Sequence, residues 1–251
     1  MIPLSLKAGL WGLASGSALI LGALLGYFFA LSQRVIASVM AFGSGVLISA
    51  LSFELMSEAY DRGGFSATAV GFVGGAVIYT VCNYILAKNG AKHRKRSGEK
   101  QPQKGTGNTG ISIAVGSILD GIPESIAIGV SMLEGGVVSI VTVIAIFLSN
   151  VPESLSSTSG MKKAGRSAKY IFWLWCSVAL ICGIASWCGY VVFANFSPEV
   201  IAATTAVAAG AILAMLADTM IPEAFETAHD FAGLITVLGF LCAFMLSKIH
   251  G

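Results

Sequence analysis

Apolar residues occupy long runs from one end of the chain to the other, and short groups of charged and turn-forming residues separate the runs. A helix that spans the hydrocarbon core of a bilayer needs about 20 mostly apolar residues, which is close to the length of each run. The pattern therefore predicts eight membrane-spanning helices in a single transmembrane domain, residues 1–251. Their expected ranges are 8–31, 35–57, 66–87, 110–132, 136–159, 169–193, 200–221 and 231–248.

The composition supports a membrane protein. Hydrophobic side chains make up 55% of the 251 residues, charged side chains make up 11%, and the mean hydropathy is +0.81. An ordinary soluble domain is much more polar than this. We expect an all-α, multi-pass integral protein of the cell (inner or plasma) membrane.

One long polar stretch, residues 88–109, interrupts the apolar pattern and carries seven basic residues against one acid. It is predicted to be a disordered loop. This stretch and the basic residues between 162 and 169 together hold eleven of the fifteen Lys and Arg residues. Because cytoplasmic loops hold the excess of Lys and Arg, we expect both segments in the cytoplasm and both chain termini outside.

Two pairs of predicted spans contain similar sequences. Residues 45–61 resemble residues 210–226 at an offset of 165, and residues 82–88 resemble residues 242–248 at an offset of 160. The second and seventh spans are five apart, so they cross the membrane in opposite senses. The pattern predicts an inverted repeat, spans one to three against six to eight, around a central pair formed by spans four and five. Such repeats place a substrate site near the bilayer midplane, although short matches in apolar sequence also arise by chance.

The central pair carries a motif of its own. Residues 121–125, Gly-Ile-Pro-Glu-Ser, are similar to residues 150–154, Asn-Val-Pro-Glu-Ser, at an offset of 29. Neighbouring spans are antiparallel, so the two motifs can face each other. Pro123 and Pro152 each remove a backbone donor, which frees a carbonyl one turn earlier, and a freed carbonyl at membrane depth needs a cation, water or protein partner.

Acidic residues lie in the middle of these two spans. A carboxylate at the centre of a spanning helix costs about 2.5 to 3.5 kcal/mol on insertion scales, so such residues usually serve a function. Asp120 and Glu124 are four residues apart and share a helix face, as Ser149 and Glu153 do. We therefore predict a divalent metal site of hard oxygen ligands. The candidate ligands are Asp120, Glu124, Ser149, Asn150 and Glu153.

The alternative for these acids is that they are protonated and hydrogen-bonded between helices, as packing contacts. Further acids lie near the ends of the repeated spans. These residues are candidates for collecting cations at the entrance and exit of a pathway, and the alternative is ordinary interfacial charge. The candidate pathway residues are Glu54, Glu58, Asp218 and Glu223.

Together these features resemble the ZIP (Zrt/Irt-like protein) family of zinc and iron transporters. The resemblance covers the eight spans, the outside termini, the basic loop and the Pro-Glu motifs of spans four and five, where the family pattern is His-Asn-x-Pro-Glu-Gly or a near variant. It implies that the five candidate ligands line the metal site. It also implies elevator-like alternating access, in which spans one, four, five and six move against the rest, and frequent formation of a homodimer.

The chain departs from the family pattern in ways that affect metal choice. Asp120 and Ser149 stand where the family has histidines, and Gly121 stands where it has Asn. The sixth span contains no Asp or Glu. The site therefore lacks the nitrogen ligands that favour zinc, and the resemblance does not extend to a second metal or to zinc selectivity.

We thus expect transport of a divalent metal cation (zinc, iron, manganese or similar) toward the cytoplasm, with the metal as substrate and no prosthetic group. Expected partners are membrane lipid and the cation, without nucleic acid. One alternative is a transporter for protons or organic cations. Another is an intramembrane hydrolase, but the chain has neither a His-Glu-x-x-His nor a Gly-x-Gly-Asp motif, so we expect no enzymatic activity.

Overall fold

The computed structural model describes residues 2–91, 109–133 and 135–250, and it is helical, with no strand in these ranges. Three short π-helical turns (η1, η2 and η3) and one 3-10 turn (η4) join or extend the α-helices. The elements are α1 (Leu4–Phe28), α2 (Gln33–Ala50), η1 (Leu51–Leu55), α3 (Met56–Leu86), η2 (Ala87–Ala91), α4 (Thr109–Ser131), α5 (Ile140–Lys163), α6 (Ala168–Phe193), α7 (Pro198–Met215), η3 (Leu216–Met220), α8 (Ile221–Ala228), η4 (His229–Phe231) and α9 (Ala232–His250).

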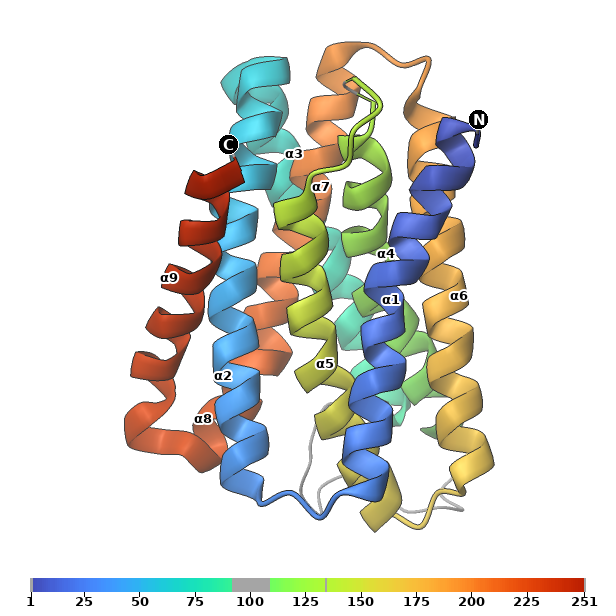
Figure 1. Cartoon of the computed structure of the whole chain (residues 1–251), viewed down its shortest axis with the longest axis vertical. Coiled ribbons are helices and arrows are strands. Elements are labelled where there is room, and N and C mark those ends of the chain that lie inside the picture. The colour runs from blue at the N-terminus through green and yellow to red at the C-terminus, as the bar shows by residue number, and fades with distance from the viewer. Residues whose placement is uncertain (1, 92–108, 134, 251) are drawn as a thin grey trace.

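Within the described residues, seven helical segments are long and apolar enough to cross a membrane, which makes the chain a multi-pass helical membrane protein by length and composition. The sequence predicted eight. The difference lies in the segment Gln33–Asn89, which counts as one run of 57 residues although it is broken at Gly64. The backbone there is not helical (φ 67°, ψ −177°), a conformation that glycine adopts without steric cost. Figure 1 shows this run rising as α2 and returning as the second part of α3, with both chain termini at the upper end.

Several predicted boundaries were wrong by a few residues. The fifth span was expected from residue 136, but α5 begins at Ile140, because Gly135 and Gly136 form a turn with positive φ and the Ser139 hydroxyl accepts a hydrogen bond from the backbone N–H of Thr142. The predicted loop 88–109 begins too early, since the helix continues through η2 to Ala91. Residues 92–108 of that loop lie outside the described part of the chain.

The helices pack as two groups. In the first group, which consists of α1, α4, α5 and α6, α1 packs against α5 and α6, and α4 packs against α6. In the second group, which consists of α2, η1, α3, α7, η3, α8 and α9, α3 packs along α7, and α2 packs along α9 and α8. The groups meet chiefly where α2 touches α5 and α4 touches α7. Figure 1 shows α9 and α2 toward one side of the bundle and α1 and α6 toward the other.

Hydrogen bonds between helices stabilise the first group. The indole N–H of Trp175 on α6 donates to Thr158 Oγ1 on α5 at 2.8 Å, and the Ser186 hydroxyl on α6 donates to the carbonyl of Ala8 on α1 at 2.8 Å. The amide of Asn150 on α5 donates to the carbonyl of Ser15 on α1 at 3.2 Å. These buried bonds tie α1, α5 and α6 into one unit.

Close helix contacts in the second group occur at glycines. Gly45 of α2 lies against the backbone of α9 at Thr236, and Gly210 of α7 lies against the backbone of α3 at Phe72, with no room for a side chain at either glycine. Small residues allow two helix backbones to approach this closely in membranes. The α2–α9 and α7–α3 contacts therefore depend on the same kind of residue.

The bounds of four elements follow a constant offset. α2 and α7 begin and end 165 residues apart, and so do the π-helical turns η1 and η3 that follow them. Gly45 and Gly210 are also 165 apart, whereas their partners Phe72 and Thr236 are 164 apart. The sequence match of residues 82–88 with 242–248 used an offset of 160. The offset of 164 given by the glycine contacts therefore differs from the offset of 160 in the sequence match by four residues, which is about one helical turn.

Candidate functional site

Two of the candidate ligands lie on α4, on the face that the sequence spacing predicted. Asp120 is 2% exposed and Glu124 is 1% exposed. The helix continues through Pro123, and α4 carries no Lys or Arg. The two carboxyl groups are therefore placed inside the helix bundle with no basic residue on their own helix.

The other three candidate ligands lie on α5 and are also buried. The Ser149 hydroxyl donates to the carbonyl of Ile146 at 2.9 Å, and the amide of Asn150 is turned toward α1. Glu153 is 4% exposed. The helix continues through Pro152, whose ring packs against Gly43 of α2, where a Cβ would come within 2.8 Å of the ring.

The two motif helices touch each other only slightly, since α4 packs against α6 and α7 while α5 packs against α1 and α2. A shared neighbour lies on α6. The Cys182 thiol lies near both motifs and contacts the Gly121 carbonyl at 3.9 Å. A Cβ at Gly121 would come within 3.0 Å of the Cys182 sulfur, so the glycine that departs from the family pattern makes room for this thiol.

Within the described residues, the acidic candidate ligands do not form a three-residue group with other acids, histidines or cysteines. Across the described ranges, no three side chains of His, Cys, Asp or Glu lie close enough together to hold a metal ion. Asp120 in particular is turned toward α3, where the phenol of Tyr79 donates a hydrogen bond of 2.6 Å to its Oδ1. The five-residue ligand set stays a prediction, and its members occupy two buried faces in the arrangement described.

The candidate pathway residues Glu54 and Glu58 follow α2 toward the upper end of the bundle. Glu54 lies in the π-helical turn η1, where its carboxylate accepts hydrogen bonds from Ser247 of α9 at 2.6 Å and from Ser139 at 3.2 Å. Glu58 forms an ion pair with Arg62 at 3.1 Å. A cation at this end would therefore meet Glu54 with neutral partners and Glu58 already paired with a basic side chain.

The two candidate pathway residues at the end of α7 differ in environment. Asp218, in the turn η3, is exposed. Glu223 of α8 is 5% exposed and accepts a hydrogen bond from the Ser156 hydroxyl of α5 at 3.3 Å. Of this pair, only Glu223 faces the interior between the two helix groups.

The sequence did not single out the residues that contact these acids. Tyr79, Ser139, Ser156, Cys182 and Ser247 all lie in apolar or small-residue runs where nothing in the local pattern marks them. Each touches an acid or its helix from a segment distant along the chain. Only the helix packing reveals them.

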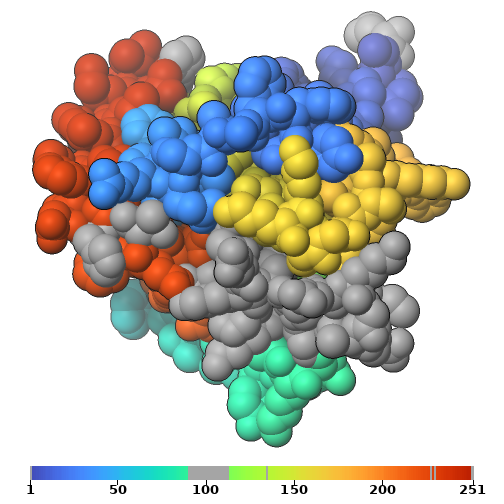
Figure 2. Space-filling view, turned by 90° about the horizontal axis from the view of Figure 1, so that it is seen from below, coloured from blue at the N-terminus to red at the C-terminus, as the bar shows by residue number. Residues whose placement is uncertain are grey.

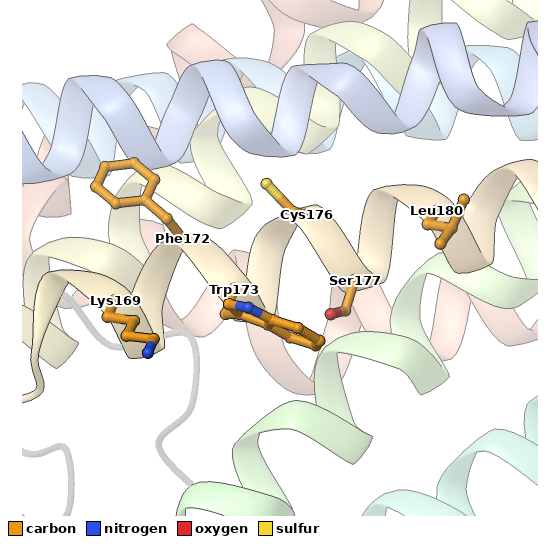
Figure 3. Close-up of a pocket in the computed structure, with 6 residues that line it drawn as sticks. All are labelled: Lys169, Phe172, Trp173, Cys176, Ser177 and Leu180. Atoms are coloured by element: carbon orange, nitrogen blue, oxygen red, sulfur yellow. The ribbon is translucent and has the colours of Figure 1, made fainter.

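An open apolar pocket of about 470 Å³ lies elsewhere, on the outer face of α6 (Figure 3). It is lined by Lys169, Phe172, Trp173, Cys176, Ser177 and Leu180. None of these residues is a candidate ligand or pathway residue. Its aromatic and aliphatic lining next to an exposed lysine is typical of a surface in contact with lipid.

Comparison of the chain with models of known protein families gave no match, and comparison with curated proteins gave none either.

Proposed function

We propose that the chain transports divalent metal cations across the membrane, with Glu124 and Glu153 as core ligands and Asp120 as a residue that tunes affinity. The observation that carries the proposal is the burial of three carboxyl groups on two membrane helices, Asp120 and Glu124 on α4 and Glu153 on α5. α4 has no basic residue, and the two lysines of α5 are in its last turn. Carboxyl groups buried at membrane depth are costly, and in membrane proteins such groups usually line a substrate or ion pathway.

The proposed topology has eight crossings. The run Gln33–Asn89 is nearly three times as long as a bilayer core is thick, and its break at Gly64 divides it into two spans. Figure 2 shows the lower end, where the turn between α1 and α2, the end of α5 with the start of α6, and the last turns of α3 are exposed. This end carries Lys162, Lys163 and Arg166, so we assign it to the cytoplasm.

The proposed transport mechanism is alternating access between two halves that share an inverted repeat. The equal offset of α2 with α7 and of η1 with η3 supports the repeat, as do the equivalent glycine contacts of α2 with α9 and of α7 with α3. The division into two helix groups supports an elevator-like movement, because the first group, α1, α4, α5 and α6, is bonded internally and carries the acids. Such transporters place the substrate at the interface of the repeats.

A proton carrier is a second candidate function. One observation favours it: in the described part of the chain, the acids make hydrogen bonds with hydroxyl groups, and no three His, Cys, Asp or Glu side chains form a group that could hold a metal. Chains of acids and hydroxyl groups can relay protons through a membrane protein. In this case the acids would exchange protons instead of binding a metal.

Uptake by the purified protein in liposomes separates the two functions. Vesicles are loaded with either a metal-sensitive or a pH-sensitive dye and are challenged with Mn, Fe(II), Co, Zn, Cd and Mg. The proposal predicts saturable uptake of at least one of these cations. Movement of protons without uptake of any metal would contradict it and would favour the proton carrier.

A further inference from the structure

A short hydrogen bond joins the two helix groups beside the candidate site. The phenol of Tyr79 on α3 donates to Asp120 Oδ1 on α4 at 2.6 Å, and the two residues are only 1% and 2% exposed. Tyr79 belongs to the second group and Asp120 to the first. A hydroxyl that donates to a carboxylate at this distance forms one of the stronger hydrogen bonds in proteins, and burial strengthens it further.

An apolar pocket of about 210 Å³ lies beside this bond, between α3, α4 and α7, and Tyr79 and Pro123 are part of its wall. The pocket is partly open to the surface, since Ile78, which also lines it, is 57% exposed. The surroundings of the bond are therefore mainly apolar, and the Tyr79 to Asp120 bond is a directional polar contact across this part of the interface.

The other cross-group contacts of the acids have the same chemistry. Glu54 of the second group accepts from Ser139 at the start of α5, and Glu223 of the second group accepts from Ser156 within α5. In each case a neutral hydroxyl donates to a carboxyl group on the opposite helix group. Such contacts differ from a buried ion pair, because the partner that leaves the carboxyl group when they break is a neutral hydroxyl and not a second buried charge.

We propose that Tyr79 is a positioning residue that competes with the transported cation for Asp120. When the site is empty, the phenol holds Asp120 toward α3 and fastens the first group to the second. A bound cation displaces the Tyr79 phenol from the Asp120 carboxylate. The hydrogen bond between the two helix groups is then lost, which favours movement of the first group. A ligand shifts a conformational equilibrium only through its different affinity for the two states, and this exchange supplies such a difference. The proposal rests on the metal-transport function proposed above.

Tyr79→Phe tests the competition because it removes the hydroxyl and keeps the ring. Without its competitor, the cation should bind more readily, and we expect the KM for uptake to fall about tenfold, which corresponds to the loss of one such hydrogen bond. In an Asp120→Asn background the same substitution should leave the KM unchanged. Tyr84→Phe is the matched control, since Tyr84 lies on the same helix but is exposed, and its KM should equal that of the unchanged protein.

A merely structural role for Tyr79 would give a different result. It would lower the melting temperature or the maximal rate of Tyr79→Phe while leaving the KM unchanged in the presence of intact Asp120. That outcome, or an equal change of KM in both backgrounds, would overturn the proposal. If Tyr79→Phe does not fold, Tyr79→Leu is measured in both backgrounds by the same criteria. Failure of the unchanged protein to take up any cation would instead contradict the proposed function itself.

Discussion

Hydroxyl groups contact the acidic residues at the places where the two helix groups meet. Asp120, Glu54 and Glu223 each accept a hydrogen bond from a tyrosine or serine of the opposite group. A hydroxyl satisfies a carboxyl group without cancelling a negative charge, whereas Lys or Arg would cancel it. The proposed transport function requires that such an acid exchange its hydroxyl partner for a cation.

The environments of the two acids near the end of α7 predict different contributions to transport. Glu223→Gln should lower the rate of metal uptake about tenfold, because it removes a buried charge that faces the interface between the groups. Asp218→Asn should leave the rate nearly unchanged, since Asp218 is exposed, unlike Glu223. Initial rates in liposomes, normalised to the amount of protein incorporated, measure both. A large loss in Asp218→Asn with normal uptake in Glu223→Gln would contradict this assignment.

The acids of the candidate site could be found from the sequence because a charge inside an apolar run is costly and therefore conspicuous. Their partners could not. Tyr79 and Cys182 are compatible with ordinary apolar helices, and their contacts depend on which helix faces form neighbours in the bundle. The spacing of Asp120 and Glu124 fixed a shared face of α4, but the direction of Asp120 toward α3 depends on the tertiary position of Tyr79.

At the level of the elements, π-helical turns interrupt the two repeated helices at matching positions. η1 carries Glu54 and η3 carries Asp218, each in the middle of an otherwise regular helix. A π-helical turn inserts an extra residue and reorients the side chains that follow, and such turns are frequent at functional sites. Here the turn after α7 lies just before the buried Glu223 on α8.

Element lengths were predictable to within a few residues, because each follows from an apolar run of membrane length. The break between the second and third spans was predicted between residues 57 and 66, and the non-helical Gly64 lies there. The register of α3 against α7 was missed. It depends on where glycines allow backbone contact, which is a property of two helices together.

Neighbouring glycines on α3 provide a direct test of this packing. Gly75→Ala should destabilise the protein by about 1–3 kcal/mol, because the backbone of Val207 occupies the space that a Cβ would need. Gly239→Ala on α9 should have a similar effect, since Phe42 of α2 lies equally close. Gly74→Ala is the control, because nothing lies within 4 Å of a Cβ at that position. The melting temperatures of the purified variants measure the effects, and equal values for Gly74→Ala and Gly75→Ala would contradict the packing.

At the scale of the whole molecule, both chain termini lie at one end of the bundle, and the turn between α5 and α6 lies at the other (Figure 1). This arrangement follows from the return of the chain at Gly64. With the proposed eight crossings, the basic turn after α5 is cytoplasmic and both termini are outside. A path of seven crossings would instead place the two termini on opposite sides of the membrane.

Epitope tags distinguish these topologies. Tags at either terminus should be accessible to an antibody added to intact cells, whereas a tag inserted at Gly165, in the turn between α5 and α6, should become accessible only after the cells are permeabilised. Gly165 has a positive φ (77°) and lies in an exposed turn, so an insertion there should be tolerated. Accessibility of only one of the two termini in intact cells would contradict eight crossings.

The most direct test of the account is cation uptake by liposomes that contain Glu124→Gln or Glu153→Gln. Both side chains keep their shape and lose their charge, and we expect uptake to fall by at least about a hundredfold, because each carboxylate is proposed to bind the cation directly. Asp61→Asn, an exposed acid on α3, serves as the control for protein insertion and should transport normally. Uptake at the unchanged rate in either glutamine variant would contradict the central claim that buried carboxylates of α4 and α5 hold the transported metal.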